Sequence, residues 1–126
     1  AIAEKNGLLV VEDAAQSVGA ISNASPVRYR SGQKSAIKNK KSSVAHSFYP
    51  GKNLGALGDG GAITTNDDEL AKVLFSLRNY GSEVKYYFDH IGVNSRLDEL
   101  QAAFLNVKLP HLDKQNNIRR LITNRY

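Results

Sequence analysis

The sequence predicts an α/β fold in which three short strands precede three helices. The apolar run of residues 8–11 ends in two acids, as a buried parallel strand does when polar groups appear at its carboxyl end. Residues 44–48 and 61–65 read as two further strands, separated by a glycine-rich turn. Apolar residues then recur at helical spacing. The predicted order is strand, loop, strand, turn, strand and three helices, which cannot close a good core alone.

Capping residues and breakers mark the helices. Asn66 with Glu69 predicts a capping box for the first of the three helices, and Ser95 with Asp98 predicts a cap for the second. Pro110 is expected to break or restart that second helix, and the remainder of the chain reads as helical but thinly apolar.

The opening of the chain also reads as a helix end. Residues 1–6 continue a helical pattern that Gly7 would stop as a C′ glycine, and methionine is absent throughout. A natural N-terminus inside a helix is not expected. We therefore interpret the chain as an interior piece of a longer protein or as a chain that has lost its N-terminal part.

The composition excludes several classes of protein. The 126 residues fit one small domain, and the absence of cysteine excludes disulfides and thiolate metal sites. Three histidines without a repeated ligand spacing predict no metal site. No apolar run reaches the roughly 20 residues that cross a bilayer, and no signal peptide opens the sequence. We expect a soluble, cytoplasmic protein that does not engage a membrane.

The net charge of +5 belongs to one stretch, residues 22–41, which holds six basic residues and no acid. The remainder of the chain holds eleven basic and twelve acidic residues, so it carries almost no net charge. Three interpretations of this stretch are open. It is a true insertion that contacts phosphates or an acidic partner, the product of a shifted reading frame in a decayed gene, or a solvated loop. Tyr29 is its only aromatic residue, so specific nucleic-acid binding is not predicted.

Residues 47–61 place a single lysine, Lys52, among five glycines, with the hydroxyl of Ser47 five positions earlier. Taken alone, Lys52 has the ordinary interpretation of a solvated lysine, and Asp13 that of a turn or capping residue. Together they match a Schiff-base lysine and an acid that pairs with a pyridinium nitrogen, the constellation of a pyridoxal phosphate site.

Four ordered segments resemble the DegT/DnrJ/EryC1/StrS family of pyridoxal phosphate-dependent nucleotide-sugar aminotransferases. They are residues 11–16 (VEDAAQ), 47–55 (SFYPGKNLG), 58–62 (GDGGA) and 92–103 (GVNSRLDELQAA). The resemblance implies a fragment of the large cofactor-binding domain of the aspartate aminotransferase (fold type I) architecture. Residues 1–109 would be part of that domain, with residues 21–43 a divergent basic loop, and residues 110–126 a helix leading toward a missing C-terminal domain.

The resemblance also implies a role for each matching residue. Lys52 would form the Schiff base and shuttle a proton, and Asp13 would keep the pyridine nitrogen protonated. Gln16 would lie against the cofactor near its ring hydroxyl, and Ser47 would donate its hydroxyl to the phosphate.

Asn94 and Arg96 would reach the phosphate region of the neighbouring subunit's site, which implies a homodimer with shared sites. Residues two apart in an extended stretch face the same way, and the spacing of these two suits that role. Without the surrounding match they would read as a loop asparagine and a solvated arginine.

The implied reaction transfers an amine from glutamate to a nucleotide-linked keto-sugar, with members that make 3-amino-3,6-dideoxyhexoses on dTDP as the most similar. A dehydrating branch has histidine in place of the lysine, and Lys52 argues against it. The chain is roughly a third of such a member, and a short domain buries a modest fraction of its surface. We therefore expect the isolated chain to be inactive and poorly stable. The alternative is a non-catalytic remnant or an anion-binding module that uses the basic loop of residues 22–41.

Overall fold

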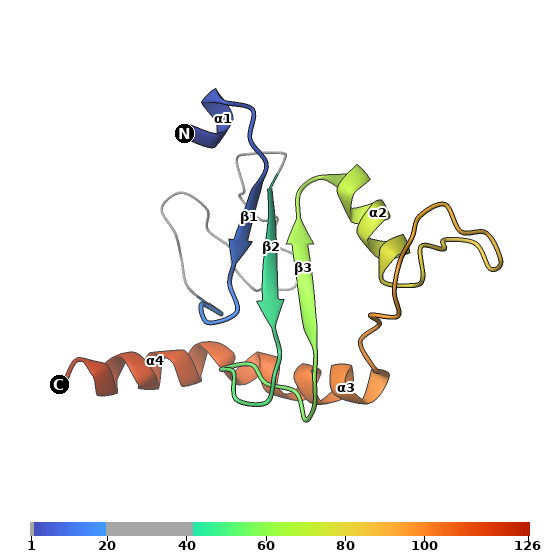
Figure 1. Cartoon of the computed structure of the whole chain (residues 1–126). Helices are drawn as coiled ribbons and strands as arrows, with labels where there is room; N and C mark the ends of the chain where they lie inside the picture. Colours follow the sequence, from blue (N-terminus) through green and yellow to red (C-terminus); the bar gives the residue numbers. More distant parts are fainter. Residues whose placement is uncertain (1, 20–41) are drawn as a thin grey trace.

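A three-stranded sheet is the centre of the computed structural model, which describes residues 2–19 and 42–126 (Figure 1). The structure confirms the predicted α/β class. The whole basic stretch of residues 22–41, including its six basic residues, lies outside the described residues. Within the described part of the chain, no helix is long and apolar enough to cross a bilayer.

The strands are β1 (Val10–Asp13), β2 (Ser42–Ser47) and β3 (Gly61–Thr65), in the spatial order β1-β2-β3. Strand β1 runs parallel to β2, and β3 runs antiparallel to it. The carboxyl ends of β1 and β2 therefore meet at the same edge of the sheet, where open α/β sheets bind their ligands. Four of the six residues predicted to bind a cofactor lie at or just after these two ends: Asp13, Gln16, Ser47 and Lys52.

The helices are α1 (Ile2–Lys5), α2 (Asp68–Leu77), α3 (Glu99–Lys108) and α4 (Leu112–Thr123). The short 3₁₀ helix η1 (Leu109–His111) joins α3 to α4 and contains Pro110, so the proline restarts the helix and does not end it. Figure 1 shows α3 and α4 running nearly in line, across the end of the sheet at which β1 and β2 finish.

The helix ends only partly follow the predictions. Gly7 has a φ of 64°, as a C′ glycine should. The cap of α2 is Asp67, one position beyond the predicted Asn66, because the Asp67 carboxylate reaches the N–H groups of Glu69 and Leu70. Asp98 precedes α3 but forms no side-chain capping bond, so the predicted cap there is wrong.

The main core lies between the glycine-rich loop and the α3–α4 helices, and not under the sheet. Its buried residues are Val18, Phe48, Leu54, Ala56, Leu105 and Leu112. A second small cluster pairs Ala14 with Val44 beneath β1 and β2. The chain thus builds its best-packed region under the segment that carries the predicted reactive lysine.

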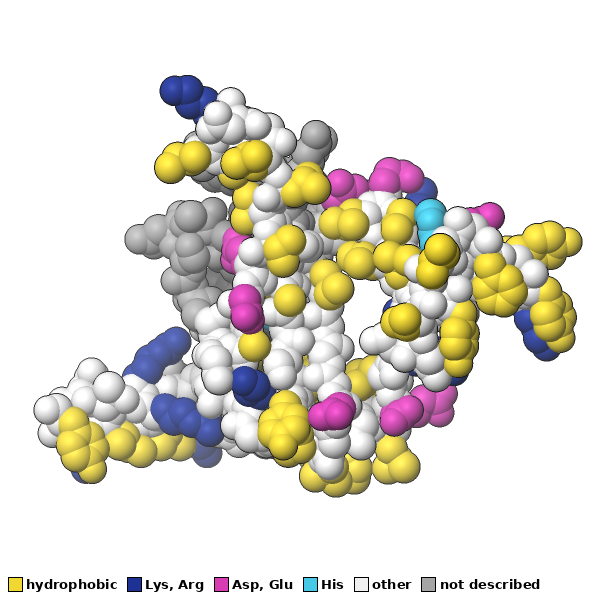
Figure 2. Space-filling model, viewed as in Figure 1, with side chains coloured by type: hydrophobic (Ala, Val, Ile, Leu, Met, Phe, Trp, Pro, Cys, Tyr) yellow, Lys and Arg dark blue, Asp and Glu magenta, His cyan; other side chains and the backbone are white. Residues whose placement is uncertain are grey.

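The prediction that residues 8–11 form a buried strand is wrong in two respects. Leu8 and Leu9 lie before β1, and Val11 within it is 74% exposed. The physical reason is that β1 lies at the edge of the described sheet, with no described helix covering its outer face. Figure 2 shows hydrophobic side chains open to the viewer along this side of the molecule and beside α2.

Candidate functional site

Lys52 lies at the end of a tight turn in the loop between β2 and β3. Its N–H donates to the carbonyl oxygen of Tyr49 at 2.9 Å, and Pro50 occupies the second position of this turn, where its fixed φ is favourable. A Cβ at Gly55 would lie 2.9 Å from the Tyr49 carbonyl oxygen and closer still to that of Pro50. Only glycine therefore lets the chain fold back over the turn that presents Lys52.

The loop is closed at its base and packed from below. Phe48 donates its N–H to the carbonyl oxygen of Gly60 at 2.7 Å, and Ala56 donates its N–H to that of Phe48 at 2.8 Å. Leu54, two residues after Lys52, is only 4% exposed. Lys52 itself is half-buried, and this hydrogen-bonded, packed loop places it beyond the carboxyl end of β2.

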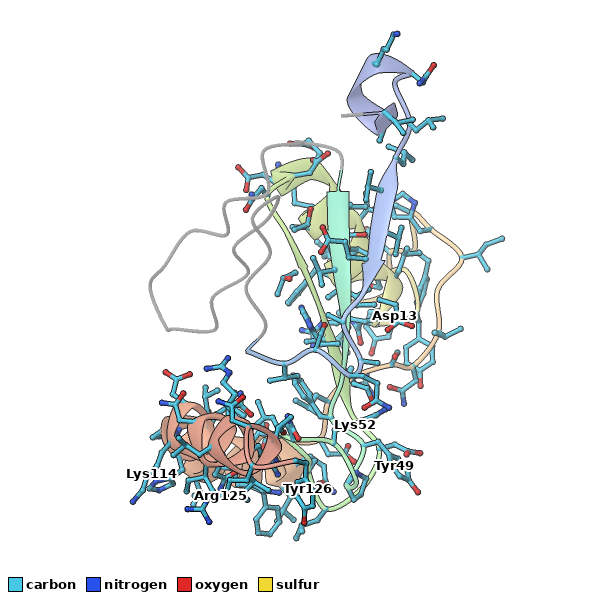
Figure 3. The ribbon with its side chains drawn as sticks, turned by 90° about the vertical axis from the view of Figure 1, so that its left-hand side faces the viewer. Asp13, Tyr49, Lys52, Lys114, Arg125 and Tyr126 are labelled. Carbon is cyan, nitrogen blue, oxygen red and sulfur yellow. The ribbon has the colours of Figure 1, made fainter. Side chains whose placement is uncertain are left out.

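Asp13 ends β1 at this same edge, and Figure 3 shows it with Lys52 between the sheet and the α3–α4 helices. Its Oδ1 accepts a hydrogen bond of 3.0 Å from the N–H of Ala15, which is the ordinary turn role. The side chain is nevertheless exposed, and the following residue, Ala14, is pinned by a bond from its N–H to the Ala45 carbonyl oxygen at 2.8 Å. The carboxylate thus has a fixed position at the sheet edge.

Ser47 and Gln16 come to the same edge from β2 and from the turn after β1. The Ser47 hydroxyl accepts a bond of 3.3 Å from the N–H of Tyr49, so it also supports the turn before Lys52. Gln16 is exposed. The structure therefore gathers four of the six predicted site residues at one edge: Asp13, Gln16, Ser47 and Lys52.

Asn94 and Arg96 lie elsewhere, beside the end of α2. Asn94 pairs with Asn79 in an antiparallel bridge, and the Arg96 Nη1 donates to the Asn79 Oδ1 at 2.6 Å. The Arg96 guanidinium also lies 5.5 Å from the centre of the Tyr80 ring. Both predicted side chains are exposed, and Asp59 and Gly60, at the far end of the loop that carries Lys52, line the groove that Arg96 borders.

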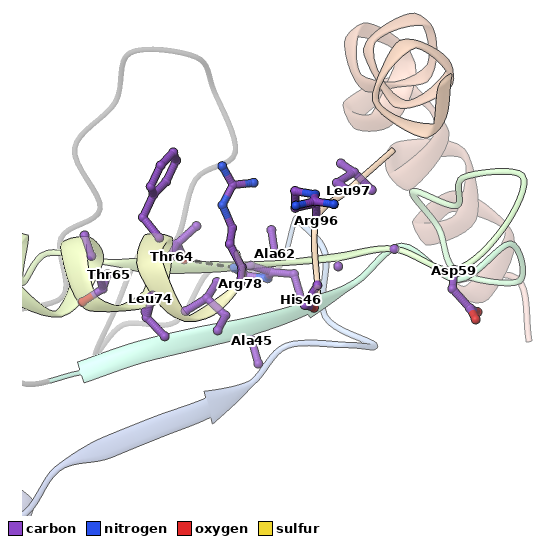
Figure 4. Close-up of a pocket in the computed structure, with 16 residues that line it drawn as sticks. Ala45, His46, Asp59, Ala62, Thr64, Thr65, Leu74, Arg78, Arg96 and Leu97 are labelled. Atoms are coloured by element: carbon purple, nitrogen blue, oxygen red, sulfur yellow. Dashed lines mark hydrogen bonds between the residues drawn. The ribbon is translucent and has the colours of Figure 1, made fainter. Parts of the chain in front are cut away.

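Arg96 borders a groove between the β2–β3 face and α2, shown in Figure 4. His46 lines the same groove and is 6% exposed, with its Nε2 3.0 Å from the Thr64 hydroxyl. Burial lowers the pKa of the His46 imidazole below its ordinary value of 6.5. Residues 2–19 and 42–126 contain no group of three side chains suited to hold a metal ion.

Three polar side chains from the α3–α4 helices hold the predicted site from below, and none was singled out from the sequence. Gln101 accepts a bond from the Leu57 N–H at 2.8 Å, and the Lys108 amine donates to the Gly55 carbonyl oxygen. The third is Asn116, which is buried. The available signal was their spacing of seven and eight residues, about two helical turns each, along the nearly continuous helices α3 and α4.

Comparison with known sequences finds a family match along the whole chain. Residues 1–126 match the DegT/DnrJ/EryC1/StrS aminotransferase family.

Two curated relatives illustrate the similarity. The erythromycin biosynthesis sensory transduction protein EryC1 of Saccharopolyspora erythraea is 52% identical over 126 residues, which are 100% of this chain and 32% of the relative. The dTDP-3-amino-3,6-dideoxy-α-D-galactopyranose transaminase of Aneurinibacillus thermoaerophilus is 55% identical over 125 residues, 99% of this chain and 32% of the relative. The chain thus spans about a third of the length of the curated relatives that it matches.

The fold is similar to that of solved aminotransferases. DesV of S. venezuelae, crystallised in complex with a ketimine intermediate, aligns with a TM-score of 0.76 at 50% identity. The alignment covers 90% of this chain and 28% of DesV. The arrangement is consistent with part of a fold type I domain.

Proposed function

Because the chain belongs to the DegT/DnrJ/EryC1/StrS aminotransferase family, we propose that it carries the cofactor-binding edge of a pyridoxal phosphate-dependent nucleotide-sugar aminotransferase. The observation that supports this most directly is the placement of Asp13 and Lys52. The acid ends one strand and the lysine follows its parallel neighbour, so both reach the same sheet edge. The complete activity, its substrates and its partners form part of the proposal.

The described residues fit such a cofactor. Lys52 is half-buried, and a side chain at the preceding Gly51 would find its nearest atom, in the Tyr49 ring, at 3.9 Å, so the backbone beside Lys52 can be approached closely by a flat ring. The Asp13 carboxylate is held at the end of β1 by the turn that begins there. Ser47 adds a hydroxyl at the end of β2 that can donate to a phosphate oxygen. These are the amine, the carboxylate and the hydroxyl that the cofactor requires.

Pyridoxal phosphate, when bound, supplies the electron sink that stabilises negative charge on a substrate carbon. Lys52 would hold the cofactor covalently and, once released, carry a proton at its Nζ. Asp13 would keep a proton on the pyridine nitrogen by pairing with it, and Gln16 would lie against the ring. Lys52 is the catalytic residue of this proposal.

The substrate class follows from the relatives. The A. thermoaerophilus relative is by name a transaminase for a dTDP-3-amino-3,6-dideoxyhexose, and DesV was solved with a ketimine. We therefore extend to this chain a dTDP-linked 3-keto-6-deoxyhexose as amine acceptor and glutamate as amine donor. Asn94 and Arg96 have exposed positions away from Lys52, which suits the proposed contact with a partner subunit's site in a homodimer.

The proposal is tested by trapping the lysine–cofactor bond in the protein as its gene encodes it, with any coding sequence that flanks residues 1 and 126. The protein is incubated with pyridoxal phosphate, reduced with borohydride, digested and analysed by mass spectrometry. We expect a phosphopyridoxyl group on Lys52 and none at this position in Lys52→Ala. Lys114→Ala is the matched control, because Lys114 is an exposed lysine on α4. A reducible adduct of equal yield in Lys52→Ala would contradict the assignment.

A further inference from the structure

Asn116 on α4 bridges the two segments that carry the proposed cofactor-binding residues. Its Nδ2 donates to the carbonyl oxygen of Val18 at 3.2 Å, and its Oδ1 accepts from the Nδ2 of Asn53 at 3.3 Å. Val18 lies in the turn segment that follows Asp13, and Asn53 directly follows Lys52. The side-chain amide of Asn116 therefore connects the segment that follows Asp13 to the loop that carries Lys52.

The amide has little room to move. Asn116 is 9% exposed, and Leu112 one turn earlier is 3% exposed within the main core. A Cβ at Gly19 would lie 2.5 Å from the Asn116 Nδ2, so the backbone of the Asp13 segment passes directly against the amide. A buried amide with a bonded oxygen and a bonded nitrogen specifies one arrangement of its partners.

We infer that Asn116 is a positioning residue that sets the placement of Asp13 relative to Lys52. The inference rests on the proposed function, because the roles of Asp13 and Lys52 belong to that proposal. It assigns no contact between Asn116 and the reacting atoms. Catalytic groups must be held within about half an ångström of their productive geometry, and supporting hydrogen bonds provide this precision. Without Asn116, the strand pairing and the apolar core would still connect the two segments, but the side-chain bonds that tie them directly would be lost.

The electrostatic consequence is measurable without turnover. The Asp13 carboxylate would favour the protonated form of the lysine–cofactor adduct, because an opposite charge stabilises a cation in proportion to its proximity. A change in the separation of Asp13 and Lys52 therefore moves the pH midpoint at which the adduct absorbance changes. Loss of general stability changes the amount of folded protein and leaves this midpoint in place.

The experiment compares Asn116→Ala with the unsubstituted gene-encoded protein, each loaded with pyridoxal phosphate and titrated with pH. We expect the absorbance midpoint of Asn116→Ala to move by about half a pH unit or more. Asn117→Ala is the matched control. Asn117 is exposed, and its Oδ1 accepts a bond from Arg120 within α4. The absorbance midpoint of the Asn117→Ala variant should equal that of the unsubstituted protein.

Asn53→Ala provides the second variant, which decides the question if Asn116→Ala does not fold. Asn53 is exposed, and its replacement removes one of the two bonds of Asn116 without a cavity. We expect a smaller midpoint shift in the same direction. Midpoints equal to that of the unsubstituted protein in every folded variant would overturn the inference while leaving the proposed function intact. Absence of a Lys52 adduct in the unsubstituted protein would overturn the proposed function, and this inference with it.

Discussion

The side-chain oxygen of Gln101 accepts a hydrogen bond of 2.8 Å from the backbone N–H of Leu57, and so joins helix α3 to the glycine-rich loop. The two residues are 44 positions apart in the sequence. The bond fixes the far side of the loop, while Lys108 and Asn116 fix regions closer to Lys52.

Gln101→Ala should lower the free energy of unfolding by about 0.5–1 kcal/mol, because a single hydrogen bond to a solvent-accessible N–H has about this net value. Urea unfolding of the gene-encoded protein measures the change. Gln115→Ala, an exposed glutamine-to-alanine change on α4, is the control and should have little effect. Equal losses in the two variants would show that the Leu57 contact contributes nothing.

Gly55→Ala should destabilise the protein by about 2–3 kcal/mol, since a methyl group there meets backbone atoms that cannot move aside. Gly51→Ala is a matched control, because its Cβ would find its nearest atom, in the Tyr49 ring, at 3.9 Å. Thermal unfolding of both variants compares the two positions. Similar melting temperatures would contradict the close approach of the loop to the Pro50 carbonyl group.

Protonation of His46 should weaken the fold in mildly acidic solution. Burial lowers the pKa of His46 in the folded state below 6.5. At pH values between this lowered pKa and 6.5, the unfolded chain therefore binds more protons than the folded chain. Stability is therefore highest above about pH 6.5, falls as the pH decreases through the interval down to the folded pKa, and then levels off.

His46→Gln removes this titration and should flatten the dependence of the free energy of unfolding between about pH 7.5 and pH 5. His90→Gln, at an exposed position, provides the control. The measurement is denaturant unfolding at several pH values. A slope that is unchanged in His46→Gln would refute the role given to this imidazole.

The purified 126-residue polypeptide should bind a dye such as anilinonaphthalene sulfonate and unfold at low denaturant concentration. Side chains such as Leu9, Val11 and Phe75 are 74%, 74% and 60% exposed, and large open apolar patches promote association. A chimera in which these 126 residues replace the matching part of the A. thermoaerophilus transaminase is expected to bind less dye. Robust transamination by the 126-residue polypeptide alone would contradict the expected inactivity.

Local patterns were sufficient to predict the class of the fold and most of its elements. The bounds of β3 match the predicted residues 61–65, and Gly7 ends α1 as its type and position indicated. Short-range signals succeed here because turns and strand alternation depend on neighbouring residues. The cap of α2 was missed by one position because Asn66 and Asp67 are both good capping residues, and only the backbone geometry chooses between them.

Burial and the support of the site could not be predicted in the same way. Val11 was expected to be buried from its apolar neighbours, yet exposure depends on what packs over the strand. Asn116 reads as an ordinary polar helix residue, and its partner Val18 lies 98 positions earlier. A pairing at this separation leaves no local trace in the sequence. The assignment of Asp13, Gln16, Ser47, Asn94 and Arg96 to a cofactor remains a prediction.

The line formed by α3, η1 and α4 also determines when the site can form during synthesis. Asn53, next to Lys52, leaves the ribosome 63 residues before Asn116, and domains form as their segments emerge. Contacts across such separations carry a large loop-closure cost, so they follow the local turns. We expect the turn at Lys52 to form early and to stay unanchored until α4 docks. Lys52 would then acquire its fixed surroundings only after α4 has been synthesised.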